Sequence, residues 1–408
     1  MELRHYTSED IRGRRVVLRA DLDVSVNADG VVDQYHDLRL ERLIPTLSDL
    51  FLAGARQVVI IGHRGRPSGN IAPELSLAPV CDRLAELARA EGLDEPIAFI
   101  EDMEVDPVVH RDQDIIMLEN LRFWPGEKNG DAAFVRTLAQ WGEVYVNDAF
   151  GASHRAHASI ALLPRALAEA FAGLGLSREV EALEGFLSHA AAPLVAVVGG
   201  AKISTKLPLL SLLAERAQSV LVGGALANTI LASRGIPMGA SLVEEAMLKK
   251  ASELSGDVFV LPEDAVVAPG RAVLVGALGP REAMRDIGPE TIKNFVQRIK
   301  EAKTILWNGP MGTFEESAYA KGSEDIARAI TENAAARVLA GGGETVELIE
   351  RLGLAQKIDF VSTGGGAMLT FLAGGDMPGL EAVSLQLRTP LSQNIISIGH
   401  EPICNTTH

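Results

Sequence analysis

The chain has 408 residues, 47% hydrophobic and 23% charged, and this length predicts two globular domains because one core rarely grows beyond roughly 250–300 residues. The net charge of -16 and the aromatic content of 5% argue against nucleic-acid binding, which requires a basic face and stacking partners. The start MELRHYTSEDIRGRR lacks an apolar signal core, and no uncharged stretch is long enough to span a membrane. Only two cysteines are present, which excludes a disulfide scaffold. We therefore expect a cytoplasmic protein.

In the first half, short runs of Val, Ile and Leu alternate with segments whose apolar residues recur at spacings of three and four. The runs predict fully buried parallel strands, and the segments predict helices packed on a sheet. The dipeptide Asp29-Gly30 between two short alternating runs predicts a hairpin. The predicted strands are Val16–Val24, Val58–Ile61, Pro96–Ile100, Ile115–Leu118 and Val144–Val146, and the predicted helices are Leu40–Leu52 and Leu77–Ala90.

The second half repeats this alternation, which predicts an α/β fold with helix-covered parallel sheets in both halves. Between them, SREVEALEGFLSHA opens with a Ser cap and Glu in the first turn, as expected of a helix joining two lobes. We therefore expect an N-terminal domain over 1–176, an interdomain helix over 177–190, a C-terminal domain over 191–380 and a tail of uncertain placement over 381–408. The predicted strands here are Leu194–Val198, Val220–Val222, Val258–Leu261, Thr304–Trp307, Val338–Ala340 and Phe360–Val361.

The segment GHRGRP, residues 62–67, follows a predicted strand and places a histidine and two arginines in a turn of glycine and proline. Open α/β sheets bind ligands where their strands end, and guanidinium groups suit phosphate or carboxylate oxygens. Further basic residues lie near other strand ends or a helix start, so we expect them to meet around one small polyanion; a solvated loop with unrelated arginines is the alternative. These residues are Arg19, Arg39, Arg122, His154 and Arg155.

Glycine-rich turns in the second half predict a site for phosphates. GGAKISTK, residues 199–206, follows a buried strand, and its two lysines would share one side of a helical turn. It does not fit the Walker pattern, and exposed lysines at an ordinary strand-to-helix turn are the alternative. Three further turns, WNGPMGTFE, GGGET and STGGGAM, would direct backbone amides and helix N-termini at one place, which suits a nucleotide. Glu315 and Glu344 add carboxylates for ribose hydroxyls or Mg²⁺.

Ten segments, in order and spacing, resemble phosphoglycerate kinase from Arg15 to about Leu380. RADLDV is similar to the family's RxDxNVP and GHRGRP to its SHLGRP. The resemblance implies two Rossmann-like lobes joined by a helix and a hinge, with 3-phosphoglycerate on the first, MgADP or MgATP on the second, and a cleft that closes by hinge bending. The remaining matches are ENLRF, NDAFGASHRAHAS, GGAKISTK, GGALANT, DIGPET, LWNGPMGTFE, GGGET and STGGGA.

The resemblance also implies a reaction and its residues: a monomeric enzyme of glycolysis and gluconeogenesis that exchanges a phosphoryl group between 1,3-bisphosphoglycerate with MgADP and 3-phosphoglycerate with MgATP. Arg39 and Lys206 would be catalytic, and Glu344 would hold the metal. The glycerate site would comprise Asp21, Leu22, Asp23, Arg39, His63, Arg64, Gly65, Arg66, Arg122 and Arg155. The nucleotide site would comprise Lys202, Lys206, Glu315, Gly342, Gly343, Glu344, Thr345, Gly364, Gly365 and Gly366.

Four positions depart from the family's pattern: Asp23 replaces asparagine, Ser25 proline, Arg64 leucine and Glu344 aspartate. The Asp23 carboxylate would repel an anionic substrate unless it is protonated or paired, and Arg64 is the expected compensating charge. The longer Glu344 could displace Mg²⁺, which tolerates poor geometry badly. A diverged protein that binds the ligands with little turnover is therefore the main alternative; a dehydrogenase lacks its glycine fingerprint.

Overall fold

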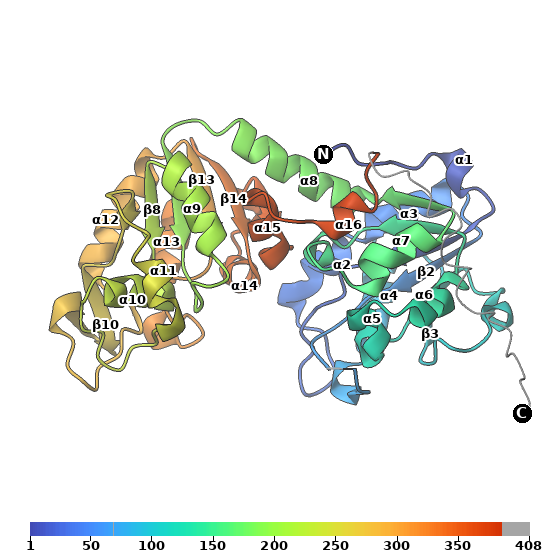
Figure 1. The fold of residues 1–408 in the computed structure, drawn as a ribbon, viewed down its shortest axis with the longest axis horizontal. Coiled ribbons are helices and arrows are strands. Elements are labelled where there is room, and N and C mark those ends of the chain that lie inside the picture. Colours follow the sequence, from blue (N-terminus) through green and yellow to red (C-terminus); the bar gives the residue numbers. More distant parts are fainter. Residues whose placement is uncertain (68, 386–408) are drawn as a thin grey trace, which may run out of the picture.

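The computed structural model describes residues 1–67 and 69–385, which form two lobes side by side along the long axis of the molecule (Figure 1). Each lobe is built on a six-stranded parallel sheet, which confirms the predicted fold class. In the N-terminal sheet the strand order is β3-β4-β2-β1-β5-β6. Its strands are β1 (Arg15–Arg19), β2 (Gln57–Ile61), β3 (Ile97–Ile100), β4 (Ile115–Leu118), β5 (Val144–Asn147) and β6 (Glu169–Ala172).

Helices cover this sheet, and every residue of β2, β4 and β5 is buried. Burial on both faces explains why these strands read as continuous apolar runs rather than as alternating patterns. The helices of the N-terminal lobe are α1 (Ser8–Ile11), α2 (Asp37–Glu41), α3 (Ile44–Leu52), α4 (Ala78–Ala90), α5 (Pro125–Asn129), α6 (Ala132–Ala139) and α7 (Leu163–Ala166).

The C-terminal sheet has the order β15-β14-β13-β7-β8-β9. A small antiparallel sheet with the order β11-β10-β12 is formed by residues between β9 and β13 in the sequence. The main strands are β7 (Leu194–Val198), β8 (Ser219–Val222), β9 (Phe259–Val260), β13 (Thr304–Asn308), β14 (Arg337–Gly341) and β15 (Phe360–Ser362); the small sheet has β10 (Asp264–Ala268), β11 (Arg271–Leu274) and β12 (Asp286–Ile287). The helices are α9 (Leu207–Arg216), α10 (Gly224–Ser233), α11 (Leu248–Ala251), α12 (Pro289–Glu301), α13 (Lys321–Glu332), α14 (Gly343–Arg351) and α15 (Gly365–Leu372).

Helix α8 (Leu174–Ser188) runs between the two lobes (Figure 1). Its buried side chains, among them Leu176 and Phe186, belong to one apolar cluster that contains residues of both sheets. After α15 the chain returns to the N-terminal lobe through α16 (Pro378–Glu381), where Gly379 N donates to Ser153 O over 2.9 Å. Most of the predicted tail, residues 386–408, lies outside the described residues. Within the described ranges, no helix is long and apolar enough to span a membrane.

Two predicted elements end or break earlier than expected. Strand β1 stops at Arg19 rather than continuing to residue 24, so that residues 20–24 form a loop at the rim of the sheet. The helix predicted over 40–52 is two helices, α2 and α3, because Pro45 in the first turn of α3 has no N–H to continue the bonding of α2. Both differences shape the site described below.

The interdomain helix also begins differently. Ser177 lies inside α8 and its hydroxyl donates to Gly173 O, so it is not the cap. Instead Asp148 Oδ1 accepts from Leu176 N over 2.8 Å, and Thr46 Oγ1 accepts from Leu174 N over 3.0 Å. Side chains from distant segments thus satisfy the amides of the first turn, which a local pattern could not reveal.

Three features of the β structure also differ. Strand β6 and the small antiparallel sheet are absent from the prediction. In β11 most residues are exposed, so that strand does not form the apolar run typical of a buried strand. The predicted hairpin at Asp29-Gly30 forms its turn, with Gly30 at a φ of 79°, but only the single bridge between Val26 and Val32 pairs its arms.

Candidate active site

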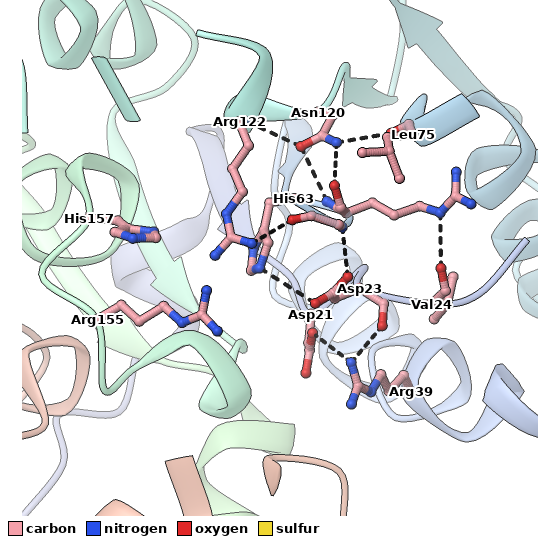
Figure 2. A network of polar contacts seen from close by, with 12 residues as sticks. Asp21, Asp23, Val24, Arg39, His63, Leu75, Asn120, Arg122, Arg155 and His157 are labelled. Atoms are coloured by element: carbon pink, nitrogen blue, oxygen red, sulfur yellow. Dashed lines mark hydrogen bonds and ion pairs between the residues drawn. The ribbon is translucent and has the colours of Figure 1, made fainter. Parts of the chain in front are cut away.

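Most of the predicted anion-binding residues of the first half meet at one rim of the N-terminal sheet, whereas His154 lines a hollow of the other lobe. Strands β4, β2, β1 and β5 are neighbours, so the segments that follow their carboxyl ends converge. Figure 2 shows the side chains gathered around one space, with Arg39 contributed by α2. The residues that the figure brings together are Asp21, Asp23, Arg39, His63, Arg122, Arg155 and His157.

A hollow of about 580 Å³ opens beside these residues and is strongly basic. Arg66, Arg122, Lys128 and Arg155 all line it. Burial, reinforced by the neighbouring Arg155, lowers the pKa of Arg122 to about 10. So many cations in one hollow repel each other, and an anion bound there would relieve that repulsion. The other lining residues are Gly69, Trp124, Pro125, Asn129 and His157.

Arg39 is fixed by three oxygens at the inner edge of this site. Its guanidinium donates to the backbone oxygen of Asp23 over 2.6 Å and lies 3.5 Å from Asp21 Oδ1. Its third contact crosses to the C-terminal lobe, where Thr363 O accepts over 3.0 Å. Arg39 therefore lies between the two lobes, and its position depends on both of them.

Asp23 and the GHRGRP turn hold each other in place. Asp23 Oδ1 accepts from Gly65 N over 2.8 Å, and Asp23 Oδ2 lies 3.9 Å from His63 Nε2. Gly65 has a φ of 62°, a conformation that strongly favours glycine, and its carbonyl accepts from Arg122 Nη1 over 2.6 Å. The turn thus brings Asp23, His63 and Arg122 into fixed relative positions.

Arg64 and Leu22 do not face this space. The Arg64 guanidinium points away and donates to the backbone oxygens of Val24, Glu74 and Ser76 over 2.9, 2.9 and 3.1 Å. Within the described ranges it forms no ion pair with Asp23, so the expected compensation by direct pairing is wrong, and its charge acts on that carboxylate only at a distance. Leu22 is completely buried and its side chain packs against Gly62, so it offers no exposed surface to a ligand.

The glycine-rich turns of the C-terminal lobe surround a second hollow, of about 550 Å³. The N-termini of α9, α14 and α15 all border it, and helix N-termini favour anions through their free amides and positive dipole ends. Most of the predicted nucleotide residues lie in its wall, whereas Lys202 is exposed and does not. The lining residues are His154, Thr205, Lys206, Asn308, Gly309, Gly342, Gly343, Glu344, Thr345, Gly365, Gly366, Leu369 and Thr370.

Lys206 is held at the base of this hollow. Its ammonium donates to the backbone oxygens of Gly199 and Asn308, the latter over 3.1 Å. Burial lowers the pKa of Lys206 to about 8, and the carboxylate of Glu344 opposes this shift. A Cβ on Gly200 would lie 3.3 Å from Lys206 Nζ and 3.4 Å from Glu344 Oε2, so both charged groups face the Gly200 turn.

A third hollow, of about 380 Å³, adjoins the second, because Glu344 lines both. Glu315 lies in its wall together with small and apolar residues such as Ala225 and Met284. The two hollows together offer one end rich in glycine amides and another end where the carboxylates of Glu315 and Asp286 join small and apolar residues. This division matches the phosphates and the nucleoside of a nucleotide.

The two lobes touch where β15 turns into α15. A Cβ on Gly364 would lie 2.3 Å from a ring carbon of Phe150, so this position requires glycine. His154 of the N-terminal lobe lines the glycine-rich hollow, and Thr363 accepts the bond from Arg39. The basic hollow and the glycine-rich hollow therefore lie on either side of one interlobe contact.

Comparison with known proteins agrees with this arrangement. The family profile described as "Phosphoglycerate kinase" matches residues 6–375. The phosphoglycerate kinase of Rubrobacter xylanophilus is 41% identical over 395 residues, covering 93% of this chain and 98% of the relative, and that of Thermosynechococcus vestitus is 39% identical over 397 residues, covering 92% and 97%. The chain belongs to the phosphoglycerate kinase family. Membership confirms the resemblance and the predicted class of enzyme, a phosphotransferase.

Solved structures of the family share the fold. The phosphoglycerate kinase of Pyrococcus horikoshii OT3 superposes with a TM-score of 0.79 at 29% identity, covering 93% of this chain and 98% of that one. The structure from Coxiella burnetii gives a TM-score of 0.74 at 33% identity, covering 92% and 97%. The two-lobe architecture is therefore that of known phosphoglycerate kinases.

The structure adds residues to the site that sequence reasoning missed. Asn120 is completely buried, and its side chain accepts from Arg64 N and Arg122 N while it donates to Arg64 O and Leu75 O. It thus joins the GHRGRP turn to the segment that carries Arg122. Asn308 plays a comparable part at the end of β13, where its amide donates to Gly341 O. An asparagine at the end of an apolar strand or within two residues of it is the signal that could have found both.

A magnesium ion fits the residues of the glycine-rich hollow only as a partner of phosphate. Among residues 1–67 and 69–385, no group of three or more His, Cys, Asp and Glu side chains could hold a metal. Glu344 supplies one carboxylate, and the buried Asn308 Oδ1 has no hydrogen-bond partner. Mg²⁺ prefers oxygen ligands and commonly binds through one or two carboxylates plus substrate phosphates, so this donor set suits it.

Proposed function

We propose that this phosphoglycerate kinase family member catalyses reversible phosphoryl transfer between 1,3-bisphosphoglycerate with ADP and 3-phosphoglycerate with ATP. The observation that carries the proposal is the position of Arg39. It bonds to Asp23 in the basic site and to Thr363 at the edge of the glycine-rich hollow. A group passing from one hollow to the other would pass near this guanidinium.

The basic hollow would bind the glycerate substrate. Arg66, Arg122 and Arg155 supply guanidinium groups for its phosphate, and Asp21, Asp23 and His63 supply hydrogen-bonding groups at the inner edge. The fixed positions of Arg39 and Arg122 favour this role, because a site that is already ordered loses little entropy on binding.

The other two hollows would bind ATP or ADP. The amides at the start of α14 and α15 border the glycine-rich hollow and would receive the phosphates, while Glu315 would accept from the ribose hydroxyls. Glu344 would hold Mg²⁺, which when bound neutralises charge on the phosphate oxygens. Lys202 is exposed and would reach the phosphates only after a change of conformation.

Phosphoryl transfer depends on positioning the two substrates and neutralising the charge of the transferring group, more than on a covalent intermediate with the protein. Arg39 and Lys206 would neutralise the equatorial oxygens of the transferring group from opposite lobes. The carboxylate of 3-phosphoglycerate is already ionised at neutral pH, so no side chain has to act as a general base. Lys206 uses two of its three N–H donors on the carbonyls of Gly199 and Asn308, so the third would serve the phosphoryl group. Hinge closure of the lobes would exclude water.

The test is a coupled assay of ATP formation from 1,3-bisphosphoglycerate and MgADP, with 3-phosphoglycerate and MgATP in the reverse direction. We expect saturable turnover in both directions at enzyme-like rates. Saturable nucleotide binding with negligible turnover would overturn the proposal in favour of a binding protein. The expected cytoplasmic location and monomeric state stay predictions, to be checked by fractionation and by light scattering.

A further inference from the structure

Arg19, the last residue of β1, is completely buried behind the glycerate site. Its Nε donates to Ser159 Oγ over 3.0 Å, and its Nη1 donates to Ala20 O. Its Nη2 lies 2.7 Å from His63 Nδ1. Arg19 faces the far side of the His63 ring from Asp23, so it stands behind the site rather than in it.

The contact with Arg19 determines where His63 carries its proton. A guanidinium has five N–H donors and no acceptor, so His63 Nδ1 must accept this hydrogen bond. The ring is then neutral, with its single proton on Nε2. We infer that Arg19 is a positioning residue that holds His63 as a neutral Nε2–H donor directed at the bound glycerate. The inference rests on the proposed assignment of His63 to the glycerate site.

The charged groups around His63 agree with a neutral ring. Arg19, Arg122, Arg155 and His157 all act on it from three different segments, and Asp23 is the one acidic group within ion-pair distance among the described residues. Burial, followed by these cations, lowers the pKa of His63 well below its usual value. A protonated ring would also set an N–H on Nδ1 against the N–H of Arg19.

A buried carboxylate supports Arg19 from behind. Ser159, which accepts from Arg19, donates through Oγ to Glu127 Oε1 over 2.7 Å and through its backbone N to Glu127 Oε2 over 2.9 Å. The side chain of Glu127 is completely buried, so its charge balances that of Arg19 with one hydroxyl between them. A series of hydrogen bonds thus runs from Glu127 through Ser159 and Arg19 to His63, whose Nε2–H is the donor on the side of the proposed glycerate site.

The direction of this donor matters for an anionic substrate. With the proton on Nε2, His63 offers a hydrogen bond to a phosphate or carboxylate oxygen. If the proton were on Nδ1 instead, Nε2 would present a lone pair to that oxygen and repel it. Arg19 would therefore strengthen substrate binding without touching the substrate, and the part of its effect that runs through His63 should vanish when His63 is removed.

The first test is nitrogen-15 NMR of the full-length protein with labelled histidines, with the His63 signals assigned by comparison with His63→Ala. We expect a neutral ring protonated on Nε2 from about pH 6 to about pH 8, the range in which an ordinary histidine titrates. In Arg19→Met a population protonated on Nδ1 should appear, whereas Arg19→Lys, which keeps a donor without an acceptor, should retain the original form. An imidazolium or an Nδ1–H ring in the unaltered protein would overturn the inference even if Arg19→Met failed to fold.

The second test is a double-mutant cycle on the KM for 3-phosphoglycerate. Arg19→Met should raise this KM about tenfold, the loss expected for a hydrogen bond to a charged group, and should add little in the His63→Ala background. The KM for MgATP should stay unchanged in both. Equal effects of Arg19→Met in the two backgrounds would overturn the positioning role.

The control is Arg298→Met, because Arg298 also donates to a serine hydroxyl, that of Ser219, but lies in the other lobe. It should change neither the His63 spectrum nor the KM. The outcomes separate the inference from the proposals beneath it. An unchanged KM in His63→Ala would overturn the glycerate-site assignment and the inference with it, whereas absence of turnover in the unaltered protein would overturn the proposed reaction.

Discussion

The two candidate sites are built from different materials. In the N-terminal site, side chains carry the chemistry: guanidinium groups and carboxylates are held by hydrogen bonds, as Arg39 and Asp23 are. In the C-terminal site, the backbone carries it: three helix N-termini and several glycines face one hollow, and among the described residues Lys206 is the only lysine in its wall. The first site should therefore be sensitive to the loss of charge, and the second to the gain of a single methyl group.

The sites also differ in whether the charge of their cationic side chain depends on pH. Arg39 contacts oxygens of both lobes. A guanidinium group is a permanent cation in proteins, whereas a lysine ammonium can lose its proton. Lys206 is buried on two carbonyls, with a pKa lowered to about 8. A permanent charge thus meets a titratable one across the interlobe contact, and pH should act on the C-terminal site first.

The largest effect is expected at Arg39. Arg39→Ala should lower turnover about 100-fold or more, because it removes charge stabilisation made in the transition state, while the affinity for nucleotide stays nearly intact. Steady-state kinetics with each substrate varied, and calorimetric binding of MgADP, measure the two quantities. Arg328→Ala, on the exposed face of α13, is the matched control. Equal losses in turnover and nucleotide affinity would contradict the division of labour between the lobes.

A methyl group at Gly309 tests the backbone site. Gly309 has a φ of 99°, and a Cβ there would lie 2.5 Å from Gly199 O and 2.7 Å from Lys206 Nζ. Gly309→Ala should therefore displace Lys206 and raise the KM for MgATP about tenfold, the effect of one lost bond to a charged group. The KM for 3-phosphoglycerate should change little.

Gly353→Ala supplies the control for backbone strain alone. Gly353 has a φ of 65°, but nothing lies within 4 Å of a Cβ at this position. It should lower the free energy of unfolding by about 1 kcal/mol without changing either KM. If both alanine variants raised the KM for MgATP alike, strain rather than contact with Lys206 would be the cause.

The third effect is a pH dependence carried by Lys206. Its pKa is lowered to about 8, so the ammonium is charged below this pH and loses its proton as the pH rises through it. The kcat/KM for MgATP should fall about tenfold for each pH unit above that point, since this ratio reports the free enzyme. Lys206→Arg should be less active but flat over the same range. An alkaline limb that persists in Lys206→Arg would belong to another group.

Sequence reasoning placed several residues of the N-terminal candidate site together because they lie at strand ends. Once the runs before His63 and Arg122 were identified as parallel strands, topology placed both residues at one rim. It failed where the direction of a side chain depends on distant backbone. Arg64 points away from the site because its guanidinium donates to the backbone oxygens of Val24, Glu74 and Ser76. No local sequence pattern indicates that those acceptors lie within its reach.

The same limit explains the other misses. The cap of α8 comes from Asp148 and Thr46, which lie 28 and 128 residues away from the amides they accept from. Asn308 belongs to a motif that was recognised, yet its role follows from bonds to Gly341 that only the folded sheet creates. Glycine patterns, by contrast, indicated which turns border the C-terminal hollow, because positive φ and close packing require glycine at particular positions of the sequence.

The smallest effect is expected at Asp23, whose carboxylate in the N-terminal candidate site should repel the anionic 3-phosphoglycerate. Arg64 bonds elsewhere, His63 is neutral on our inference, and Arg39 contacts the backbone of Asp23 rather than its carboxylate. Asparagine would keep the oxygen that accepts from Gly65 N and remove the charge. The Asp23 side chain is 40% exposed, so solvent screens the repulsion, and Asp23→Asn should lower the KM for 3-phosphoglycerate about threefold.

Salt separates this charge effect from a change of shape. The gain from Asp23→Asn should shrink as ionic strength rises, because screening removes the repulsion in the unaltered protein first. Asp94→Asn, an exposed charge outside the site, controls for the change in net charge. A KM that is unchanged or higher in Asp23→Asn would mean that the cations of the basic hollow already compensate this carboxylate. The side-chain site would then tolerate an acidic residue as part of its balance of charge, as the backbone site tolerates Glu344 beside Lys206.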